Sequence, residues 1–368
     1  MGIPQKQGLN KHPSVLICGS TQGEYGGIEA VMFALADYLY KTAIPCSLVF
    51  KLVKGASVRS SLNEAIAATS VSCEVVSRLD RRLIRLLDQA DIIHTQNVPP
   101  DIVFLAKVLG KPVLSITHNY LHPSFSARKL LWRLGSLVCD YVSYNSRFVQ
   151  ETWIEGVMTN SRSRVIPTLS TLPSLRTPGG RRKGFVFISR WIPNKGADLL
   201  IESYARAQID RREWPLIMMG DGPERSRLEQ IVSERGIEGI SILGRVSEKE
   251  KFERMHEAKW IVVPPHTHED MGLTPIEGRV MGTPAIASLD GGIPESAGED
   301  ALFFPPGDQA ALTKCIETAA EMSENAYLDR ASRCQTSLKS YLKPMSVYLQ
   351  WYEAAYGKSV NQPAASSI

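Results

Sequence analysis

The chain has 368 residues, of which 43% are hydrophobic and 22% charged, a balance typical of a soluble globular protein and not of a disordered or fibrous chain. This length exceeds the usual size of one hydrophobic core and predicts two domains of about 170 to 190 residues each. The sequence lacks an apolar run of membrane-spanning length, a signal-peptide core after Met1 and any C-x-x-C spacing among its six cysteines. We therefore expect a cytoplasmic protein with buried free thiols.

Positive charge is concentrated in the first half of the chain. Residues 1–178 contain 19 Lys and Arg against 12 Asp and Glu, a net +7, whereas the remainder contains 23 against 26, a net −3. Two stretches, 78–87 and 128–133, mix basic and apolar residues at helical spacing. They could rest on an anionic membrane surface, meet an anionic acceptor or form solvated helix faces. No arginine-rich run with interleaved aromatic residues indicates a nucleic-acid partner.

Strand and helix patterns alternate along the first half. An apolar run at 15–18 predicts the first strand, and a glycine-rich loop then leads to an amphipathic helix over 28–40. Further strands are predicted at 46–50, 92–94, 113–116 and 141–144, and further helices at 101–109 and 126–137. Such alternation predicts a parallel sheet with flanking helices.

The same alternation restarts at residue 185, after a stretch rich in Pro, Ser, Thr and Gly that has no usable periodicity. The predicted divisions are an N-terminal Rossmann-like domain over 1–170, a linker over 171–184, a C-terminal Rossmann-like domain over 185–342, a C-terminal helix over 343–357 that could pack back on the first domain, and a disordered tail over 358–368.

Two carboxylates, Glu269 and Glu277, flank a turn that contains Gly272 and the expected start of a helix near Thr274. The buried strand predicted at 261–263 places this turn at the carboxyl end of a strand, where open α/β sheets bind ligands. Backbone N–H groups at a helix start attract phosphate oxygens. One carboxylate could then bind a sugar and the other a ribose of one nucleotide-sugar. The simpler alternative is a solvated loop residue and an exposed helix face.

With these residues in place, the chain resembles glycosyltransferase family 4, the retaining nucleotide-sugar transferases of the GT-B fold. Glu269 and Glu277 match the family motif E-x7-E, and Gly282-Thr283-Pro284 and Gly291-Gly292 fit its neighbours. The resemblance covers roughly residues 13 to 356. It implies two Rossmann-like domains of parallel sheet and flanking helices that face each other across a cleft.

Arg190 and Lys195 resemble the two cations that hold the donor diphosphate in this family. Fixed positive charge there would stabilise the leaving diphosphate more in the transition state than in the ground state. The alternative is a surface Arg and Lys near a helix start. The other donor contacts implied in the second domain, several of which could equally be plain turns, are Gly220, Gly222, Arg245, Val246, Met271, Gly272, Leu273 and Thr274.

In the first domain, Gly26 and Gly27 resemble the glycine loop of the family, which approaches the donor. A glycine turn that only closes a β–α connection is the alternative. His118, at the end of a predicted strand, resembles the active-site histidine that faces the donor sugar, although an isolated histidine is often structural.

Three segments depart from the family pattern. Thr168-Leu169-Ser170 replaces the usual Asn-Gly-Val, Met271 replaces a Phe, and Gly278 stands where Ala is common. The departures leave the identity of the donor open.

The resemblance implies transfer of a sugar, with retention and without a required metal or other cofactor, from a UDP- or GDP-type nucleotide-sugar to a hydroxyl acceptor. Arg190 and Lys195 would bind the diphosphate, Glu269 the sugar hydroxyls, Glu277 the ribose, and His118 the sugar near the reacting carbon. The basic first half suggests a saccharide or lipid-linked acceptor, in bacterial cell-surface polysaccharide, lipopolysaccharide or glycolipid synthesis at the inner face of the plasma membrane.

Two rivals stay open at this stage. A Rossmann dehydrogenase would need G-x-G-x-x-G spacing after the first strand, which the loop at 19–27 lacks. A donor-binding pseudoenzyme or scaffold subunit would bind the nucleotide and transfer nothing.

Overall fold

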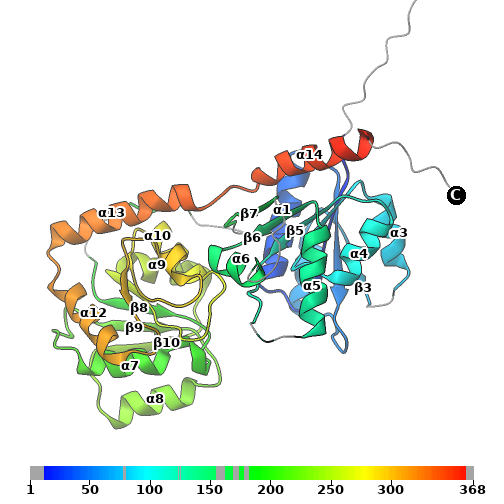
Figure 1. The fold of residues 1–368 in the computed structure, drawn as a ribbon. Helices are drawn as coiled ribbons and strands as arrows, with labels where there is room; N and C mark the ends of the chain where they lie inside the picture. The colour runs from blue at the N-terminus through cyan, green and yellow to red at the C-terminus, as the bar shows by residue number, and fades with distance from the viewer. Residues whose placement is uncertain are drawn as a thin grey trace, which may run out of the picture. The chain divides into compact units, whose positions relative to one another are not determined.

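In the computed structural model, the described residues are 12–77, 80–122, 124, 126–154, 162–168, 174–177 and 182–361. They form two compact units, each built on a parallel sheet (Figure 1). Of the described residues, those within Met1–Tyr144, Trp153–Thr171 and Pro344–Ile368 make the first unit, and those within Asn145–Thr152 and Leu172–Lys343 make the second.

The sheet of the first unit has the strand order β3-β2-β1-β4-β5-β6-β7, and every neighbouring pair is parallel. Its strands are β1 (Val15–Thr21), β2 (Cys46–Leu52), β3 (Ser72–Val76), β4 (Ile92–Gln96), β5 (Val113–Thr117), β6 (Tyr141–Tyr144) and β7 (Ser163–Val165). The helices between them are α1 (Gly27–Lys41), α2 (Ser60–Ala68), α3 (Arg82–Gln89), α4 (Pro100–Val108), α5 (Ala127–Val138) and α6 (Arg147–Ile154). The central strands β4 and β5 are buried along their whole length, as expected for a parallel sheet covered on both faces.

The last helix, α14 (Val347–Asn361), packs on the sheet of the first unit. The hydroxyl of Tyr352 lies 2.5 Å from Nδ1 of His94 on β4, and the Tyr348 ring meets the same imidazole edge-on. Burial lowers the pKa of His94 to about 3, so this histidine is a neutral core residue. The helix continues past 357 to Asn361, so residues 358–361 do not belong to the predicted tail, and 362–368 lie outside the described residues.

The sheet of the second unit has the order β10-β9-β8-β11-β12-β13, again entirely parallel. Its strands are β8 (Phe185–Ile188), β9 (Leu216–Met219), β10 (Ile240–Gly244), β11 (Trp260–Val263), β12 (Ala285–Ser288) and β13 (Leu302–Phe304). Its helices are the 3-10 turn η1 (Pro193–Lys195), α7 (Ala197–Arg206), α8 (Arg225–Glu234), α9 (Glu248–Glu257), α10 (Leu273–Val280), α11 (Ile293–Ala297), α12 (Gln309–Glu321) and α13 (Glu324–Tyr341). Figure 1 shows α7, α8 and α12 on one face of this sheet and α9, α10 and α13 on the other.

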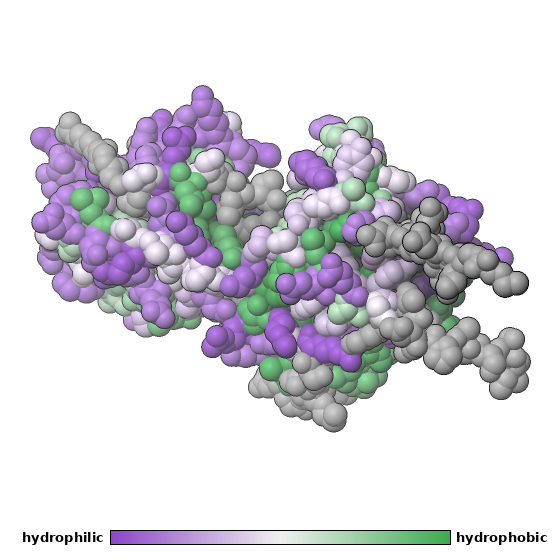
Figure 2. Space-filling model, turned by 90° about the horizontal axis from the view of Figure 1, so that it is seen from above, coloured by the Kyte–Doolittle hydropathy of each residue, from purple (hydrophilic) through white to green (hydrophobic). Residues whose placement is uncertain are grey.

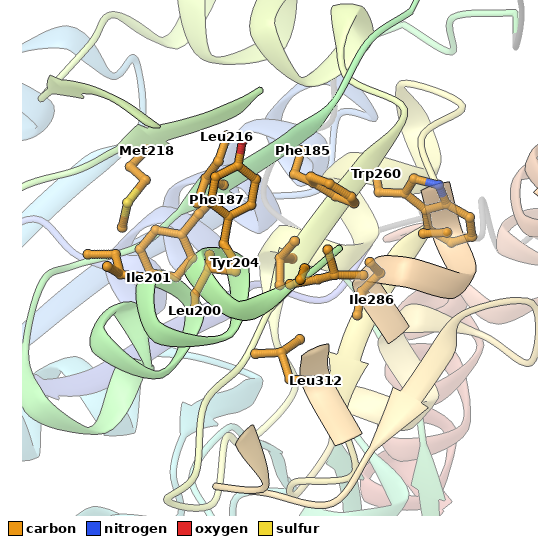
Figure 3. Close-up of a cluster of buried hydrophobic side chains, with 14 of the residues drawn as sticks. Phe185, Phe187, Leu200, Ile201, Tyr204, Leu216, Met218, Trp260, Ile286 and Leu312 are labelled. Carbon is orange, nitrogen blue, oxygen red and sulfur yellow. The ribbon is translucent and has the colours of Figure 1, made fainter. Parts of the chain in front are cut away.

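The core beneath α7 and α12 fixes the central strand β8. Phe185 and Phe187 are two residues apart on β8, so their rings lie on the same face of the sheet. Figure 3 shows them among Leu200 and Tyr204 of α7 and Leu312 of α12. The carboxyl end of β8 is therefore held rigidly where the chain turns toward η1.

Two segments belong to the second unit although the sequence placed them elsewhere. Residues 145–152 were predicted within the first domain, but Ser146 Oγ donates to the Asp270 carbonyl at 2.5 Å. The Glu295 carboxylate accepts from the N–H groups of Arg147 and Phe148 at the start of α6, a favourable place for negative charge.

The end of the predicted linker is also packed into the second unit. The buried guanidinium of Arg182 donates to the Gly282 carbonyl at 2.9 Å and to Thr283 Oγ1 at 2.8 Å. Of the rest of that linker, 171–173 and 178–181 lie outside the described residues.

Among all helices in the described ranges, none has both the length and the apolar character required to cross a bilayer.

Candidate active site

The turn before α10 borders a small pocket in the second unit. Gly272 adopts a φ of +78°, and a Cβ there would lie 2.4 Å from Ile293 Cδ1, so only glycine fits. Leu273 and Thr274, the first residues of α10, line this pocket, and N–H groups at a helix start have no partner within the helix. The residues that line the pocket include Ser189, Lys195, Glu269, Gly272, Leu273 and Thr274.

Lys195 and Glu269 form an ion pair in this pocket, between Nζ and Oε1. Their side chains are 17% and 22% exposed, so a ligand can reach both. Lys195 ends η1 and is followed by Gly196 at φ +72°, where a Cβ would lie 2.0 Å from the Pro264 carbonyl oxygen. Two residues that sequence reasoning assigned to the donor are thus brought together from distant parts of the chain.

The backbone of Glu269 is clamped by the segment that follows β12. The carboxylate of Asp290, which is buried, accepts from the N–H groups of His268 at 2.9 Å and Glu269 at 3.0 Å. The Gly292 N–H donates to the Glu269 carbonyl at 2.7 Å, and a Cβ on Gly291 would lie 2.2 Å from that oxygen. The sequence analysis did not predict this support, for which the only local signal is an acid two residues after a buried strand.

Glu277 has an unpredicted partner in Lys251 of α9. Its Oε1 accepts from Lys251 Nζ at 2.9 Å, and Lys251 also bonds Glu248 Oε2 at 2.8 Å. Burial raises the pKa of Glu277, and the positive charge of Lys251 opposes that rise. The sequence did not single out Lys251, because the many charged residues of α9 are typical of a solvent-exposed helix.

The two glycines of the Gly220-Asp221-Gly222-Pro223 turn lie too close to the backbone of a neighbouring segment for any side chain to fit. Gly220 has a φ of +126°, and a Cβ there would lie 1.8 Å from the Ser189 carbonyl oxygen. A Cβ on Gly222 would lie 2.3 Å from the Trp191 carbonyl oxygen. The turn therefore supports the backbone of 189–191, which carries Arg190; a direct contact of these glycines with the donor stays a prediction.

Several predicted donor residues do not line the pocket. Arg190 and Arg245 are exposed, Val246 is half-buried, and Met271 is buried. Glu277 lies beyond the pocket wall, one helical turn into α10. Of the predicted donor residues, the pocket thus gathers Lys195, Glu269 and the start of α10.

In the first unit, His118 follows β5 and is held by two residues at the end of β4. The Asn97 side-chain oxygen accepts from the His118 N–H at 2.7 Å, and the Gln96 side-chain oxygen lies 2.7 Å from His118 Nε2. With the Gln96 amide in this orientation, Nε2 carries the ring proton. Burial lowers the pKa of His118 to about 4, so the imidazole is neutral near pH 7.

The end of β4 is strained where it supports His118. Asn97 and Val98 have φ values of +58° and +47°, unusual for any residue with a side chain and especially for a β-branched one. Gln96 is only 2% exposed, and its Nε2 has no hydrogen-bond partner among the described residues. Sequence reasoning singled out neither Gln96 nor Asn97, although both follow the predicted strand at 92–94.

A larger pocket of about 1300 Å³ lies in the first unit. One part of its wall is polar and includes the ion pair between Lys51 and Asp101, at 2.6 Å. The apolar and aromatic part of its wall comprises Ile28, Leu52, Val53, Phe104, Tyr120, Leu121, Leu131, Trp132 and Trp153. Such a wall suits a ligand with both polar and apolar parts.

The glycine loop of the first unit is organised by a capping box. Gly26 precedes α1, and its N–H donates to Glu29 Oε2 at 3.1 Å. The other oxygen of Glu29 accepts from Thr21 Oγ1 at 2.6 Å. A Cβ on Gly27 would meet no atom within 4 Å, so no packing in the described residues requires glycine there.

Comparison with known proteins covers both units. The family described as "Glycosyltransferase Family 4" matches residues 25–169, and "Glycosyl transferases group 1" matches residues 177–334. The chain belongs to glycosyltransferase family 4. The resemblance inferred from the sequence is therefore confirmed.

The chain is also similar to proteins of known name. The D-rhamnosyltransferase WbpZ of Pseudomonas aeruginosa is 26% identical over 82% of this chain and 86% of its own length. The exopolysaccharide phosphotransferase SCO2592 of Streptomyces coelicolor is 29% identical over 45% of this chain but only 18% of its own length. The chain also spans well under two thirds of several other curated relatives that it matches.

The solved structure of HepE from Anabaena in complex with UDP superposes with a TM-score of 0.76 at 17% identity, over 94% of this chain and all of that one. This similarity confirms the predicted fold class of two Rossmann-like domains. The roles of individual residues stay predictions.

In the described ranges no group of three or more His, Cys, Asp or Glu is placed to hold a metal ion. Metal independence of the reaction also stays a prediction.

Proposed function

We propose that this protein transfers a sugar from a nucleotide-diphosphate sugar of the UDP or GDP type to a hydroxyl acceptor, with retention of anomeric configuration. The observation that carries the proposal is the convergence of Lys195, Glu269 and the start of α10 on one pocket of the second unit. A cation and the backbone N–H groups at a helix start suit the diphosphate of such a donor, and a carboxylate suits its hydroxyl groups.

In this proposal the donor replaces the ion pair between Lys195 and Glu269. Lys195 turns to the diphosphate, whose inner oxygens bind the first N–H groups of α10, and exposed Arg190 adds a second cation. Glu269, released from Lys195, accepts hydrogen bonds from the sugar hydroxyls. As the bond from the anomeric carbon to the phosphate oxygen breaks, its electrons stay on the diphosphate, and the fixed cations stabilise that charge.

The nucleoside end of the donor extends toward Glu277. Its carboxylate accepts hydrogen bonds from the ribose, and Lys251 keeps it charged despite its burial. Arg245 and Val246, after β10, border the base. This division places the two family glutamates at opposite ends of one diphosphate.

The first unit supplies His118 and the acceptor. The neutral imidazole of His118 contacts the sugar near the reacting carbon, and Asn97 and Gln96 fix its position. The acceptor hydroxyl oxygen bonds to the anomeric carbon, and its proton passes to the leaving phosphate. With this base, no carboxylate nucleophile is required. The glycine loop at Gly26 and Gly27 approaches the donor phosphate.

The names of the relatives support a setting in bacterial cell-surface polysaccharide, lipopolysaccharide or glycolipid synthesis. The acceptor in such a pathway is a saccharide or a lipid-linked saccharide. We place the protein in the cytoplasm, at the inner face of the plasma membrane.

A donor panel tests the proposal. The full chain is incubated with UDP-, GDP- and ADP-sugars, and thermal shift and nucleoside diphosphate release are measured. At least one donor should raise the unfolding temperature and be consumed, and the shift should fall in Lys195→Ala but not in Lys249→Ala, whose side chain is exposed on α9. A folded protein that responds to no donor contradicts the proposal, and binding without turnover on any acceptor supports the scaffold alternative.

A further inference from the structure

Helix α5 of the first unit carries a row of exposed apolar side chains. The members of this α5 ridge are 36% to 49% exposed and recur at helical spacing, so they share one face. They are Leu130, Leu131, Leu134, Leu137 and Val138. Figure 2 shows hydrophobic surface on the first unit beside hydrophilic surface. A face of this kind needs a covering surface.

The charges on α5 indicate what covers the ridge. The helix contains Arg128, Lys129 and Arg133 and no acidic residue. Lys129 Nζ is held by the carbonyls of His122 and Ser124, each at 2.7 Å, at the start of the helix. Apolar residues beside cations, without acids, are the pattern of a helix that lies in the interface of an anionic membrane.

The α5 ridge is continuous with the large pocket of the first unit. Leu131 belongs to the ridge and also lines the pocket, together with Arg128 and Trp132 of the same helix. The Arg128 guanidinium lies 4.6 Å from the centre of the Trp132 ring. Another part of the same pocket is lined by the polar residues Lys51, Gln96 and Asp101. The pocket therefore offers polar contacts inside and an apolar exit along α5.

We propose that the α5 ridge rests on an anionic membrane and that the pocket beside it binds an acceptor whose lipid chain remains in the bilayer. The acceptor class is a saccharide linked to a membrane lipid. Its sugar enters the polar part of the pocket, and its lipid leaves past Leu131. The acceptor role rests on the proposed transfer reaction, whereas the membrane contact does not.

Vesicle flotation of the full chain tests the membrane contact. The protein should float with vesicles that contain phosphatidylglycerol, float poorly with pure phosphatidylcholine, and lose binding as salt is added. The double variant Leu130→Ser/Leu134→Ser, which leaves the pocket lining intact, should weaken vesicle binding on the order of tenfold or more. Tyr40→Ser, at an exposed apolar residue of α1, is the matched control and should float as the wild type does.

A second probe tests the pocket. Dodecyl maltoside below its micelle concentration should bind the wild type more tightly than maltose does, and Trp132→Ala should reduce this difference. Equal affinity for the two probes would overturn the acceptor class.

The same samples separate this inference from the proposed reaction. The thermal shift caused by UDP or GDP should be unchanged in the Ser variant, because the donor pocket lies in the second unit. Indifference of the wild type to lipid charge, or equal flotation of the Ser variant, would refute the membrane contact whatever the donor result. A dimer that the Ser variant abolishes, without vesicle binding, would refute it too and identify the ridge as a protein interface.

Discussion

The candidate sites of the two units differ in how they handle charge. In the second unit the key carboxylates are each paired with a lysine, Glu269 with Lys195 and Glu277 with Lys251. In the first unit His118 is neutral, and its supports Gln96 and Asn97 are amides.

The difference indicates a division of labour. Each lysine and each glutamate of a half-buried ion pair can give up its partner and bind a charge or a hydroxyl group of an anionic donor. No charge is then left unpaired. A neutral site beside an apolar pocket suits an acceptor with an apolar part. The first unit is nevertheless the more basic one, and we assign part of that charge to the surface of α5. Each prediction below affects one unit and spares the other.

The largest effect is expected for Lys195→Ala. Loss of the cation on the leaving diphosphate should lower the transfer rate about 100- to 1000-fold, by analogy with removal of one transition-state contact. Single-turnover consumption of the donor measures the rate, and Lys249→Ala serves as the control. A rate within a few-fold of the wild type would remove Lys195 from the mechanism.

A smaller effect is expected for His118→Gln in the first unit. The amide keeps a hydrogen-bonding group but cannot reproduce the ring, so the rate should fall about 10- to 100-fold. The thermal shift caused by the nucleoside diphosphate should not change, because that ligand binds the second unit. Loss of nucleotide binding in this variant would contradict the assignment of nucleotide binding to the second unit alone.

Lys251→Met is expected to weaken donor binding about tenfold, since Glu277 loses its charged partner. Burial raises the pKa of Glu277, and without Lys251 that rise is unopposed, so binding should weaken as the pH falls, starting at a higher pH than in the wild type. Titration calorimetry at several pH values measures this shift. Lys251→Arg should restore binding, and a parallel pH profile in the Met variant would argue against the pair.

The smallest effect concerns stability. Burial lowers the pKa of His118 from 6.5 to about 4. Between these pH values the imidazole is protonated in the unfolded chain and neutral in the folded first unit. Stability from this group is complete above pH 6.5 and is lost as the pH falls toward 4. Urea unfolding of His118→Gln should therefore show a weaker loss across this window than the wild type, and identical pH dependence would contradict the buried neutral state.

Much of the fold could be predicted from apolar periodicity. The strands predicted at 113–116 and 141–144 match β5 and β6 to within one residue, because both are regular and almost entirely buried. The strand β3 was not predicted, since its sequence Ser-Cys-Glu-Val-Val is half polar and lies at a sheet edge. Edge strands bury little, so their pattern is weak.

The candidate site was predictable only where a local motif marks it. Glu269, Glu277 and Lys195 stand in recognisable contexts. Asp290 and Lys251 do not, because their partners lie 21 and 26 residues away and are reached only through the packing of the sheet. The support that Asn97 gives to His118 depends likewise on a strained turn that no periodicity encodes.

A crystal structure of the protein soaked with the nucleotide-sugar that gives the largest thermal shift tests the central claim most directly. We predict that Lys195 has left Glu269 and lies within hydrogen-bonding distance of the diphosphate, that the diphosphate meets the start of α10, and that Glu277 accepts from the ribose. A donor bound elsewhere, or one bound beside an intact ion pair of Lys195 and Glu269, would contradict the account.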